Sequence, residues 1–260
     1  MKNLIVDIGA NKGDFCIHAA KYNPNHSILA IEPIPFLCKK LEHLAEKNNL
    51  KNLYIYECAI DKKSYHADLN ISSKTDYGVS SILNFNHDVI NTNEYWKSRK
   101  DLKNDSIIQV EVKKLKDVLN DYDNFLVEFI KIDAQGKDIE VLESCENHLE
   151  KIQAGMLEVS TTNFSKLYEN EKHNLTSALN FLEENNFEIY SLSPNDPASN
   201  EMNVYFKKKN IEISYLEETL NLKKLKIYSA KRYWNLPNSK NGIFLPLLKH
   251  LIRLLFRPFK

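Results

Sequence analysis

The segment Val6–Gly13, which reads Val-Asp-Ile-Gly-Ala-Asn-Lys-Gly, constrains the fold more than any other part of the chain. A short apolar run over 4–8 ends at Gly9, which is typical of a buried parallel strand that enters a tight turn. Glycine has no Cβ, so the chain can turn sharply here and its backbone can approach a ligand closely. The sequence therefore predicts a strand–turn–helix unit that binds a small molecule at the end of a sheet.

A carboxylate follows at the tip of the next predicted strand. Glu32 lies 19 residues past Gly13, where folds of this type place the side chain that binds ribose hydroxyls. A dinucleotide site needs the spacing GxGxxG, because the middle glycine lets a pyrophosphate approach the backbone. Here that position is Asn11, so the turn suits a nucleoside without pyrophosphate, and Asp7 is placed to meet an ammonium group directly or through water. This combination favours S-adenosylmethionine over a dinucleotide.

Strands and helices alternate on both sides of a less regular middle region. Strands are predicted over 4–8, 27–31, 53–59, 65–71, 107–115, 126–132, 152–159, 187–192 and 203–208. Helices are predicted over 14–21, 35–48, 137–147 and 175–185. A further candidate strand covers 78–83, and the polar stretch 84–105 has no assignment. Such alternation predicts right-handed βαβ units and a largely parallel sheet with a closing strand pair.

The composition is that of an ordinary globular protein, with 43% hydrophobic and 27% charged residues among 260. The four cysteines are scattered without a CxxC pair, which argues against a zinc site or a disulfide framework and favours a reducing compartment. The sequence shows no secretory leader and no apolar run of roughly 20 residues, the length of a membrane-spanning helix. We therefore expect a cytoplasmic protein without a transmembrane helix.

Charge is divided unevenly along the chain, although the formal net charge is zero. Residues 1–218 carry 35 acidic and 25 basic side chains, whereas the remainder carries ten basic and no acidic ones. We therefore expect a domain over 1–210 and a basic extension over 211–260 with an amphipathic helix near 246–257. This helix suits the anionic surface of a membrane, while docking on the protein's own acidic domain or on a second subunit is a competing interpretation. A nucleic-acid partner is disfavoured, because the extension has no recognition module.

The chain contains, in this order, the blocks VDIGANKGDF, AIEPIP, AID, GVSSIL, FIKIDAQGKDIEVLES and LEVS. Together they resemble the FkbM family of S-adenosylmethionine-dependent methyltransferases, over roughly residues 3–208. The resemblance implies an α/β class I methyltransferase (Rossmann-like) fold, with a seven-stranded, mostly parallel sheet, helices on both faces and a last strand that runs antiparallel. It also implies S-adenosyl-L-methionine as the cofactor and O-methylation as the reaction, often of a sugar hydroxyl.

Matched position by position, the resemblance assigns three groups of residues. The cofactor-binding residues are Asp7, Gly9, Asn11, Gly13, Glu32, Ala59, Ile60 and Asp61. The catalytic residues are Asp133, Glu158 and Lys131, and the substrate-binding residues are Ser80, Ser81 and Gln135. No metal ligand is assigned, because no dense cluster of histidine and acidic residues favours a divalent ion.

A hydroxyl acceptor is a weak nucleophile until a base takes its proton. Asp133 is the first candidate for that base and Glu158 the second, while Lys131 is placed to steer a carboxylate-bearing acceptor or to tune Asp133. The family usually has a glutamate at the position of Gln135. This departure means that another group does the work of that carboxylate or that the activity is altered.

The sequence does not identify the methyl acceptor. The leading hypothesis is an O-methyltransferase that modifies a sugar hydroxyl of a cell-surface glycan or of a related small molecule, in the cytoplasm or at the inner face of the membrane. The alternatives are a methyltransferase for lipid, protein or nucleic acid, and a catalytically silent protein that binds the cofactor or serves as a membrane scaffold. Gln135 supports the silent protein, and the lack of an Asn-Pro-Pro-Tyr strand end disfavours base methylation.

Overall fold

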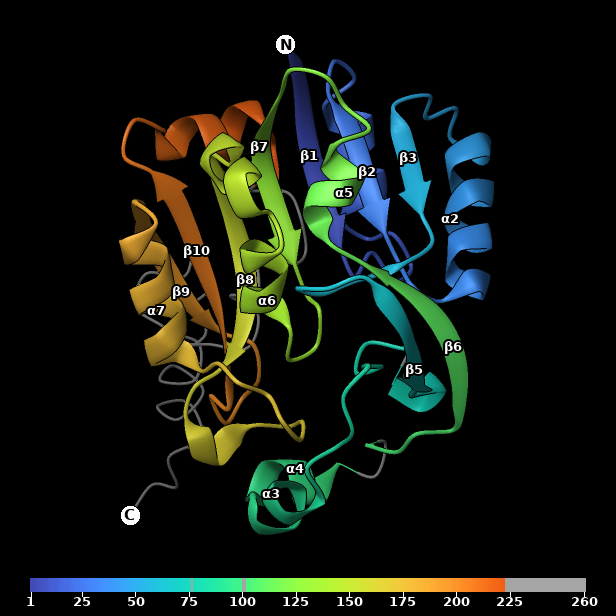
Figure 1. Ribbon diagram of the computed structural model, residues 1–260, viewed down its shortest axis with the longest axis vertical. Helices are drawn as coiled ribbons and strands as arrows, with labels where there is room; N and C mark the ends of the chain where they lie inside the picture. The colour runs from blue at the N-terminus through green and yellow to red at the C-terminus, as the bar shows by residue number, and fades with distance from the viewer. Residues whose placement is uncertain (76, 100–101, 223–260) are drawn as a thin grey trace, which may run out of the picture.

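A computed structural model describes residues 1–75, 77–99 and 102–222. Its main feature is a seven-stranded sheet with the strand order β3-β2-β1-β7-β8-β10-β9 (Figure 1). The strands are β1 (Lys2–Ile8), β2 (Ser27–Ile31), β3 (Leu53–Tyr56), β7 (Phe125–Ile132), β8 (Ala154–Ser160), β9 (Phe187–Pro194) and β10 (Glu201–Lys208). Neighbours from β3 to β8 pair in parallel, whereas β10 runs antiparallel to both β8 and β9. The predicted fold class, with its antiparallel last strand, is confirmed.

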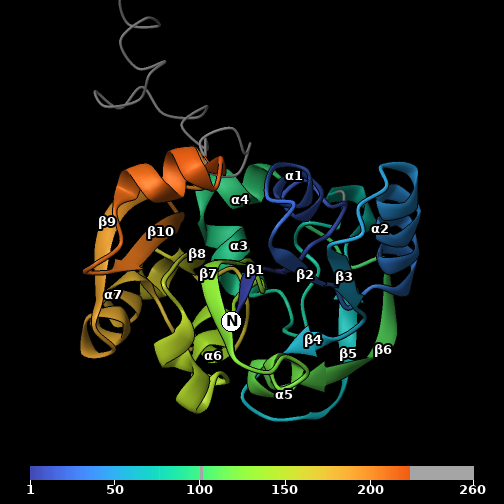
Figure 2. The ribbon, with the colours of Figure 1, turned by 90° about the horizontal axis from the view of Figure 1, so that it is seen from above.

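Helices cover both faces of this sheet, so its central strands must be apolar on both sides. One face carries α1 (Cys16–Tyr22), α2 (Pro35–Lys47) and the short helix η4 (Tyr215–Thr219). The other face carries α5 (Leu115–Leu119), α6 (Asp138–Glu143), the 3₁₀ turn η2 (Glu146–Lys151) and α7 (Leu175–Glu184), as the view from above shows (Figure 2). In β1, successive residues from Leu4 to Val6 are fully buried, which explains the unbroken apolar run of that strand.

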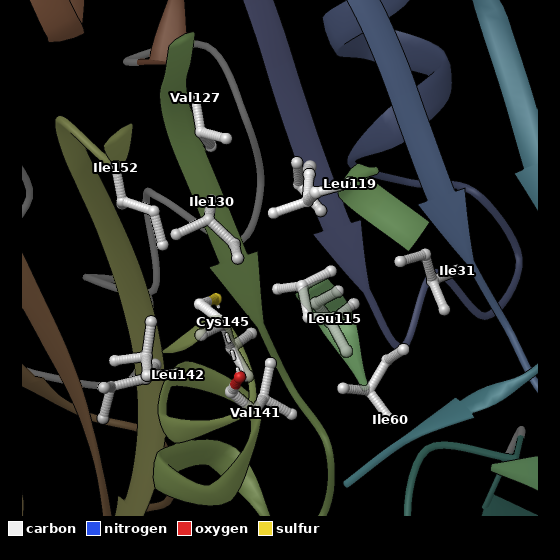
Figure 3. Close-up of a cluster of buried hydrophobic side chains, with 14 of the residues drawn as sticks. Ile31, Ile60, Leu115, Leu119, Val127, Ile130, Val141, Leu142, Cys145 and Ile152 are labelled. Carbon is white, nitrogen blue, oxygen red and sulfur yellow. Dashed lines mark hydrogen bonds between the residues drawn. The ribbon is translucent and has the colours of Figure 1, made fainter. Parts of the chain in front are cut away.

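Apolar packing of α5 and α6 against one face of the sheet fixes the strand ends. Figure 3 shows Leu115 of α5 and Val141 of α6 directed toward Ile130 of β7, with all three side chains at 1% exposure or less. Full burial of one such side chain contributes about 1.5–3 kcal/mol. A cluster of this kind holds the carboxyl ends of the strands in fixed relative positions, which a binding site at those ends requires.

Most predicted elements coincide with observed ones, and the strands over 27–31 and 65–71 match β2 and β5 (Tyr65–Ile71). The predicted strand over 53–59 is wrong at its end. The chain leaves the main sheet after Tyr56, and Ala59–Ile60 form β4, which pairs with β6 (Ser106–Lys113) in a separate sheet of order β4-β6-β5. The predicted helix over 137–147 is two shorter pieces, α6 and η2.

The small sheet and the segments 72–75, 77–99 and 102–105 lie beyond the carboxyl ends of the main strands (Figure 1). The candidate strand over 78–83 is wrong, because in its place Ser81 makes one isolated bridge with Asn70. The unassigned stretch 84–105 contains α3 (His87–Thr92) and α4 (Glu94–Ser98), and the turn η1 (Ser73–Thr75) precedes it. Side chains of Asn86 and Asn93 cap the two helices by accepting backbone N–H groups in their first turns.

Residues 211–222 pack on the face that carries α1. Leu216, Leu220 and Leu222 are buried there, and the Asn23 amide donates to the Leu220 carbonyl oxygen at 3.1 Å. The amphipathic helix predicted near 246–257 lies outside the described residues, as does everything beyond 222. Within the described ranges, the helices are all too short or too polar to span a bilayer.

Candidate functional site

A pocket of about 680 Å³ opens at the carboxyl ends of β1, β2 and β7. Its floor consists of the strand ends 8–9, 31–32 and 133–135, and its roof comes from the small sheet and the segment 77–82. The chain leaves β1 toward β2 on one side, while β7 pairs with β1 on the other, so the pocket lies at a switch point of the sheet. Open α/β sheets bind their ligands at such a crevice.

Gly9 lets the first turn pass directly over the neighbouring strand. Its φ is 71°, and a Cβ at this position would lie 2.1 Å from the Asp133 carbonyl oxygen. Asn11 also has a left-handed backbone, with φ 48°, and its N–H donates to the Glu32 carboxylate at 2.8 Å. The structure thus brings the predicted turn and the predicted ribose ligand together in one wall of the pocket.

Glu32 is a buried carboxylate that faces this pocket. Its two oxygens accept backbone N–H groups of Asn11 and Ile34, at 2.8 and 3.0 Å. Burial raises the pKa of Glu32 to about 7, although these two donors act in the opposite direction. A carboxylate has about four acceptor positions, so Glu32 keeps capacity for the hydroxyl groups of a ligand such as a ribose.

Gly13 and Asp7 support the turn from behind and do not line the pocket. A Cβ on Gly13 would lie 2.6 Å from the Leu41 side chain, so this glycine allows α1 and α2 to pack closely. Asp7 accepts the N–H of Cys16 at the start of α1 (3.2 Å), and its second oxygen lies 3.4 Å from the Lys131 ammonium. Both residues therefore shape the loop that Gly9 and Asn11 present.

Lys131 is buried between two carboxylates at the end of β7. Its ammonium lies 3.4 Å from Asp7 and 3.3 Å from Asp133, and it donates to the Gly9 carbonyl oxygen at 3.2 Å. Burial alone would lower the pKa of Lys131, but Asp133 and Asp7 outweigh it and raise that pKa above its usual value. The lysine is not part of the pocket lining, so its position suits tuning of Asp133 better than steering of an acceptor.

Asp133 presents a partly exposed carboxylate to the pocket, with 31% of its side chain accessible. One oxygen faces Lys131, and the other accepts a hydrogen bond from the Gln135 amide at 2.5 Å. Gln135 itself has φ 48° and lines the pocket beside Asp133. The departure from the family glutamate therefore places a neutral donor against the candidate base.

The two predicted serines both line the pocket from the roof. Ser80 accepts the N–H of Ser72 at 3.0 Å. Ser81 accepts the N–H of Leu83 at 3.0 Å and donates to the Gln135 carbonyl oxygen at 2.8 Å. Their hydroxyls therefore fold the segment 72–83 and fasten it to the loop after β7.

Ala59 and Ile60 form part of the apolar end of the pocket. Asp61 lies behind them and does not line it, because its carboxylate accepts hydrogen bonds from Lys137 (3.1 Å) and Tyr65 (2.8 Å). The remaining apolar lining comes from Ile8, Ile31, Pro33, Ile34, Leu37, Cys58, Leu69 and Ile82. An apolar slot beside a hydroxyl-binding carboxylate suits the base and the ribose of a nucleoside.

Several lining residues were missed from the sequence. Pro33 and Ile34 directly follow Glu32, and Lys137 lies in the block around Asp133, so their places in the chain carried a usable signal. Tyr77 was considered only as one of several aromatic residues in the irregular region that could stack on a sugar ring, and no sequence pattern indicated its φ of 73°, which is uncommon for a bulky residue. The other missed residues of the roof, such as Leu69, lie in or beside predicted strands, whose pattern did not show which side chains would face a ligand.

Glu158, the second candidate base, lies at the tip of β8 outside the pocket lining. Its N–H donates to Asp138 (2.9 Å), whose other oxygen accepts the N–H of Ala134 (3.1 Å). Asp138 thus joins the ends of β7 and β8, and burial raises its pKa to about 8. Burial and the neighbouring Glu201 also raise the pKa of Glu158 well above its usual value. Of the two candidates, Asp133 is therefore the one that faces the pocket.

In residues 1–75, 77–99 and 102–222, no three His, Cys, Asp or Glu side chains are grouped as metal ligands would be. The charged groups that line the pocket are Glu32, Asp133 and Lys137. This set can bind hydroxyl groups at one end and accept a proton at the other, with an apolar slot alongside.

Comparison with known proteins identifies the family. The chain matches the model of the Methyltransferase FkbM domain over residues 7–189. It is 26% identical over 145 residues to "Methyltransferase 1" of Beauveria bassiana, a match that covers 54% of this chain and 57% of that protein. It is 41% identical over 51 residues to a tRNA (guanine-N(7)-)-methyltransferase of Mycoplasmopsis synoviae, covering 20% of this chain and 25% of that protein. The chain thus matches little more than half the length of the first relative and a quarter of the second.

Solved structures with a similar arrangement include a precorrin-6y C5,15-methyltransferase from Geobacter metallireducens, with 13% identity, coverage of 81% and 82%, and a TM-score of 0.43. They also include M. capricolum TrmK in complex with S-adenosyl-homocysteine, with 12% identity, coverage of 98% and 90%, and a TM-score of 0.42. The family match extends from Asp7 to Ile189 and contains every residue discussed above for the pocket. The chain therefore belongs to the FkbM family of S-adenosylmethionine-dependent methyltransferases.

Proposed function

We propose that this methyltransferase transfers the methyl group to a hydroxyl oxygen, with Asp133 as the general base. The observation that carries the proposal is the position of the Asp133 carboxylate, which faces the pocket and is held between the Lys131 ammonium and the Gln135 amide. An ionised carboxylate accepts hydrogen bonds only, so it is suited to take the proton of an acceptor hydroxyl.

The pocket fits S-adenosylmethionine in three respects. Glu32 suits the ribose hydroxyls, the apolar slot that includes Leu37 and Ile60 suits the adenine, and the open backbone at Gly9 suits the methionine part. When bound, this cofactor supplies an electrophilic methyl group on a sulfonium. The chain itself needs to hold the acceptor in line with that methyl group and to receive one proton.

Lys131 and the roof position the groups that hold the acceptor and receive its proton. The lysine carries no proton to the reaction, because it lies behind the pocket and is fixed by Asp7, Asp133 and the Gly9 carbonyl oxygen. It keeps the Asp133 carboxylate oriented toward the pocket. From the roof, Ser81 lines the pocket and donates to the Gln135 carbonyl oxygen in the loop that carries Asp133, at 2.8 Å.

We infer that the acceptor hydroxyl belongs to a sugar of a glycan or of a related small molecule. The roof supports this, because Ser80, Ser81 and Tyr77 line the pocket together. Hydroxyl groups that hydrogen-bond and an aromatic face that stacks are a suitable combination for a polyol with one apolar face. Trp96 of α4, another aromatic residue of this region, is fully buried and belongs to the packing of α3 and α4.

The substitution Asp133→Asn tests the proposal. We expect turnover with a crude cell-surface glycan fraction to fall about 10²- to 10⁴-fold, the usual contribution of a general base. Binding of S-adenosylhomocysteine, measured by calorimetry, is expected to stay within about twofold of wild type, since asparagine keeps the shape. Glu158→Gln serves as the control, with little change in turnover. Turnover of Asp133→Asn near the wild-type value would exclude Asp133 as the base.

We also propose that the basic extension places the enzyme on an anionic membrane surface. Ten basic and no acidic side chains follow residue 218, and each basic residue near such a surface contributes about 1 kcal/mol. The full chain is expected to float with phosphatidylserine-containing liposomes, and a chain truncated after Gly242 is expected to float less. Equal flotation of the two proteins would leave docking on the enzyme's own domain or a second subunit as the better explanation.

A further inference from the structure

Two side chains of the loop after β7 and one from a distant part of the chain form a row of hydrogen bonds, here called the line, that ends at Asp133. The Tyr168 hydroxyl donates to Gln135 Oε1 at 2.6 Å, and Gln135 Nε2 donates to Asp133 Oδ1 at 2.5 Å. The same hydroxyl lies 3.1 Å from the Val79 carbonyl oxygen, a second acceptor within reach. Tyr168 is buried behind Gln135 and does not line the pocket, so it has no direct part in ligand binding.

Neighbouring residues hold the backbone of Gln135 and the ring of Tyr168 in place. The Gln135 carbonyl oxygen accepts the Ser81 hydroxyl, and Gly136 follows at φ 92°, where a Cβ would lie 3.1 Å from the Tyr168 ring. The Tyr168 ring stacks on Phe85 with the ring centres 5.6 Å apart. The side-chain amide and the hydroxyl proton are therefore the parts that can turn without moving the fold.

The line has two complete arrangements, which differ in the proton on Asp133. With Asp133 ionised, the amide must donate to it, and the amide oxygen accepts the Tyr168 hydroxyl, as observed. With Asp133 protonated, the carboxyl donates to the amide oxygen after the amide has turned over. The amide then donates to the Tyr168 oxygen, and the Tyr168 hydroxyl turns to the Val79 carbonyl oxygen. Each polar group in the line has a partner in both arrangements.

We propose that Gln135 and Tyr168 are positioning residues. When Asp133 gains or loses a proton, the Gln135 amide and the Tyr168 hydroxyl rotate from one of these arrangements to the other. The inference rests on the proposed function, in which Asp133 takes the proton of the acceptor hydroxyl. It also explains the departure from the family glutamate. A glutamine offers a donor group and an acceptor group at every pH, whereas a glutamate would either repel the ionised Asp133 or share a single proton with it.

Tyr168→Phe should make proton uptake by Asp133 less favourable. The ionised arrangement loses one hydrogen bond, from the hydroxyl to Gln135, whereas the protonated arrangement loses two, from Gln135 and to Val79. One hydrogen bond changes an equilibrium about two- to tenfold. We therefore expect the titration midpoint of Asp133 to fall by about 0.5–1 pH unit, measured by ¹³C NMR of the full chain labelled at aspartate carboxyl carbons.

Gln135→Met should move the same midpoint in the opposite direction. Methionine has a similar length but offers no strong donor or acceptor, so the ionised carboxylate loses a charge-assisted hydrogen bond. The protonated form loses a weaker neutral one, so the midpoint should rise by about 0.5–1 pH unit. Should the methionine protein fail to fold, Gln135→Glu gives the same sign, because two adjacent carboxylates share one proton.

The charged groups near Asp133 remain the same in Tyr168→Phe and Gln135→Met. They are Asp7 of β1, Lys131 of β7, Asp138 of α6, Glu158 of β8 and Glu201 of β10. Tyr65→Phe is the matched control. It removes a tyrosine–carboxylate hydrogen bond to Asp61 of 2.8 Å without touching the line to Asp133, so the Asp133 midpoint should not move.

Opposite shifts in Tyr168→Phe and Gln135→Met support the inference. Unchanged midpoints, or shifts of the same sign, overturn it, because a general loosening of packing cannot produce two signs. Binding of S-adenosylhomocysteine to the wild-type protein is measured in parallel. If the wild-type protein does not bind S-adenosylhomocysteine, the proposed function is contradicted. The titration midpoints of Asp133 would still decide whether the Gln135 amide rotates when Asp133 is protonated.

Discussion

The floor and the roof of the pocket are held in different ways. The floor joins the ends of β1, β2 and β7, whose parallel pairing places Asp7 opposite Lys131 and brings Gly9 over Asp133. The roof combines the small sheet with the irregular segment 77–82, and that segment is held by a few hydrogen bonds such as the one from Ser81 to the Gln135 carbonyl oxygen. A position in the floor is thus fixed by the backbone of the main sheet, whereas a position in the roof depends on individual side chains. Changes in the floor should therefore cost more.

Gly9→Ala should have the largest effect. An added Cβ would lie 2.1 Å from a backbone oxygen of the chain just after β7, which cannot move without distorting the sheet, and the φ of 71° is strained for alanine. Overpacking and strain together should cost about 3 kcal/mol or more in the free energy of unfolding, measured by urea denaturation. Asn11→Gly is the control in the same turn, because glycine tolerates φ 48° and keeps the N–H that binds Glu32. Similar stabilities of the two variants would mean that the floor is less rigid than the sheet pairing indicates.

Lys131→Met should rank second. It leaves the buried Asp7 carboxylate without its nearby charge, and removing one partner of a buried pair costs about 3 kcal/mol. Lys62→Met breaks the more exposed pair with Glu143, for which about 0–1 kcal/mol is expected. Thermal unfolding of both variants in one buffer compares the two sites directly. Equal losses would contradict the role of Lys131 as a buried counter-ion.

The pH dependence of cofactor binding tests the floor through Glu32. Its pKa of about 7 means that the carboxylate ionises between pH 6 and 8, and the ionised form accepts hydroxyl hydrogen bonds more strongly. The affinity for S-adenosylhomocysteine should therefore rise about tenfold over that range, measured by calorimetry. Glu32→Gln should bind more weakly, with a flat profile.

The same shift affects the stability of the protein without ligand. The unfolded chain gives up this proton near its ordinary pKa of 4.5, before the folded protein does at about 7. The contribution of Glu32 to stability is therefore present below pH 4.5 and is lost as the pH rises to about 7. Glu32→Gln should remove this part of the pH dependence, which urea titrations at several pH values can detect.

The floor could be predicted from the sequence because its signals are local. An apolar strand, Gly9 in the turn and Glu32 one strand later are close in the chain, and parallel pairing brings their ends together. Gln135 could be flagged as a departure, but its consequence could not be derived. Its partner Tyr168 is 33 residues away, behind a region without clear periodicity.

The structure of the roof could not be predicted, because it depends on long-range contacts and on unusual backbone angles. The strand predicted over 53–59 has continuous β propensity, but pairing with β6 rather than β2 decides where its last residues lie. Ser80 and Ser81 were placed near the pocket by resemblance alone, and their segment is held by side-chain hydrogen bonds and one isolated bridge to Asn70 instead of continuous strand pairing. Tyr77 adopts φ 73°, which the intrinsic preference of tyrosine opposes.

Ser81→Ala should have the smallest effect and bears most directly on the roof. The substitution removes the hydrogen bond to the Gln135 carbonyl oxygen and leaves the N–H of Leu83 without this acceptor. A loss of about 1 kcal/mol in stability is expected, together with a several-fold fall in turnover and little change in S-adenosylhomocysteine affinity. Ser98→Ala, which removes an exposed hydrogen bond to Tyr95, provides the control. If the affinity for S-adenosylhomocysteine falls as far as turnover does, the roof contributes to cofactor binding as much as the floor. That result would contradict the proposed difference between floor and roof.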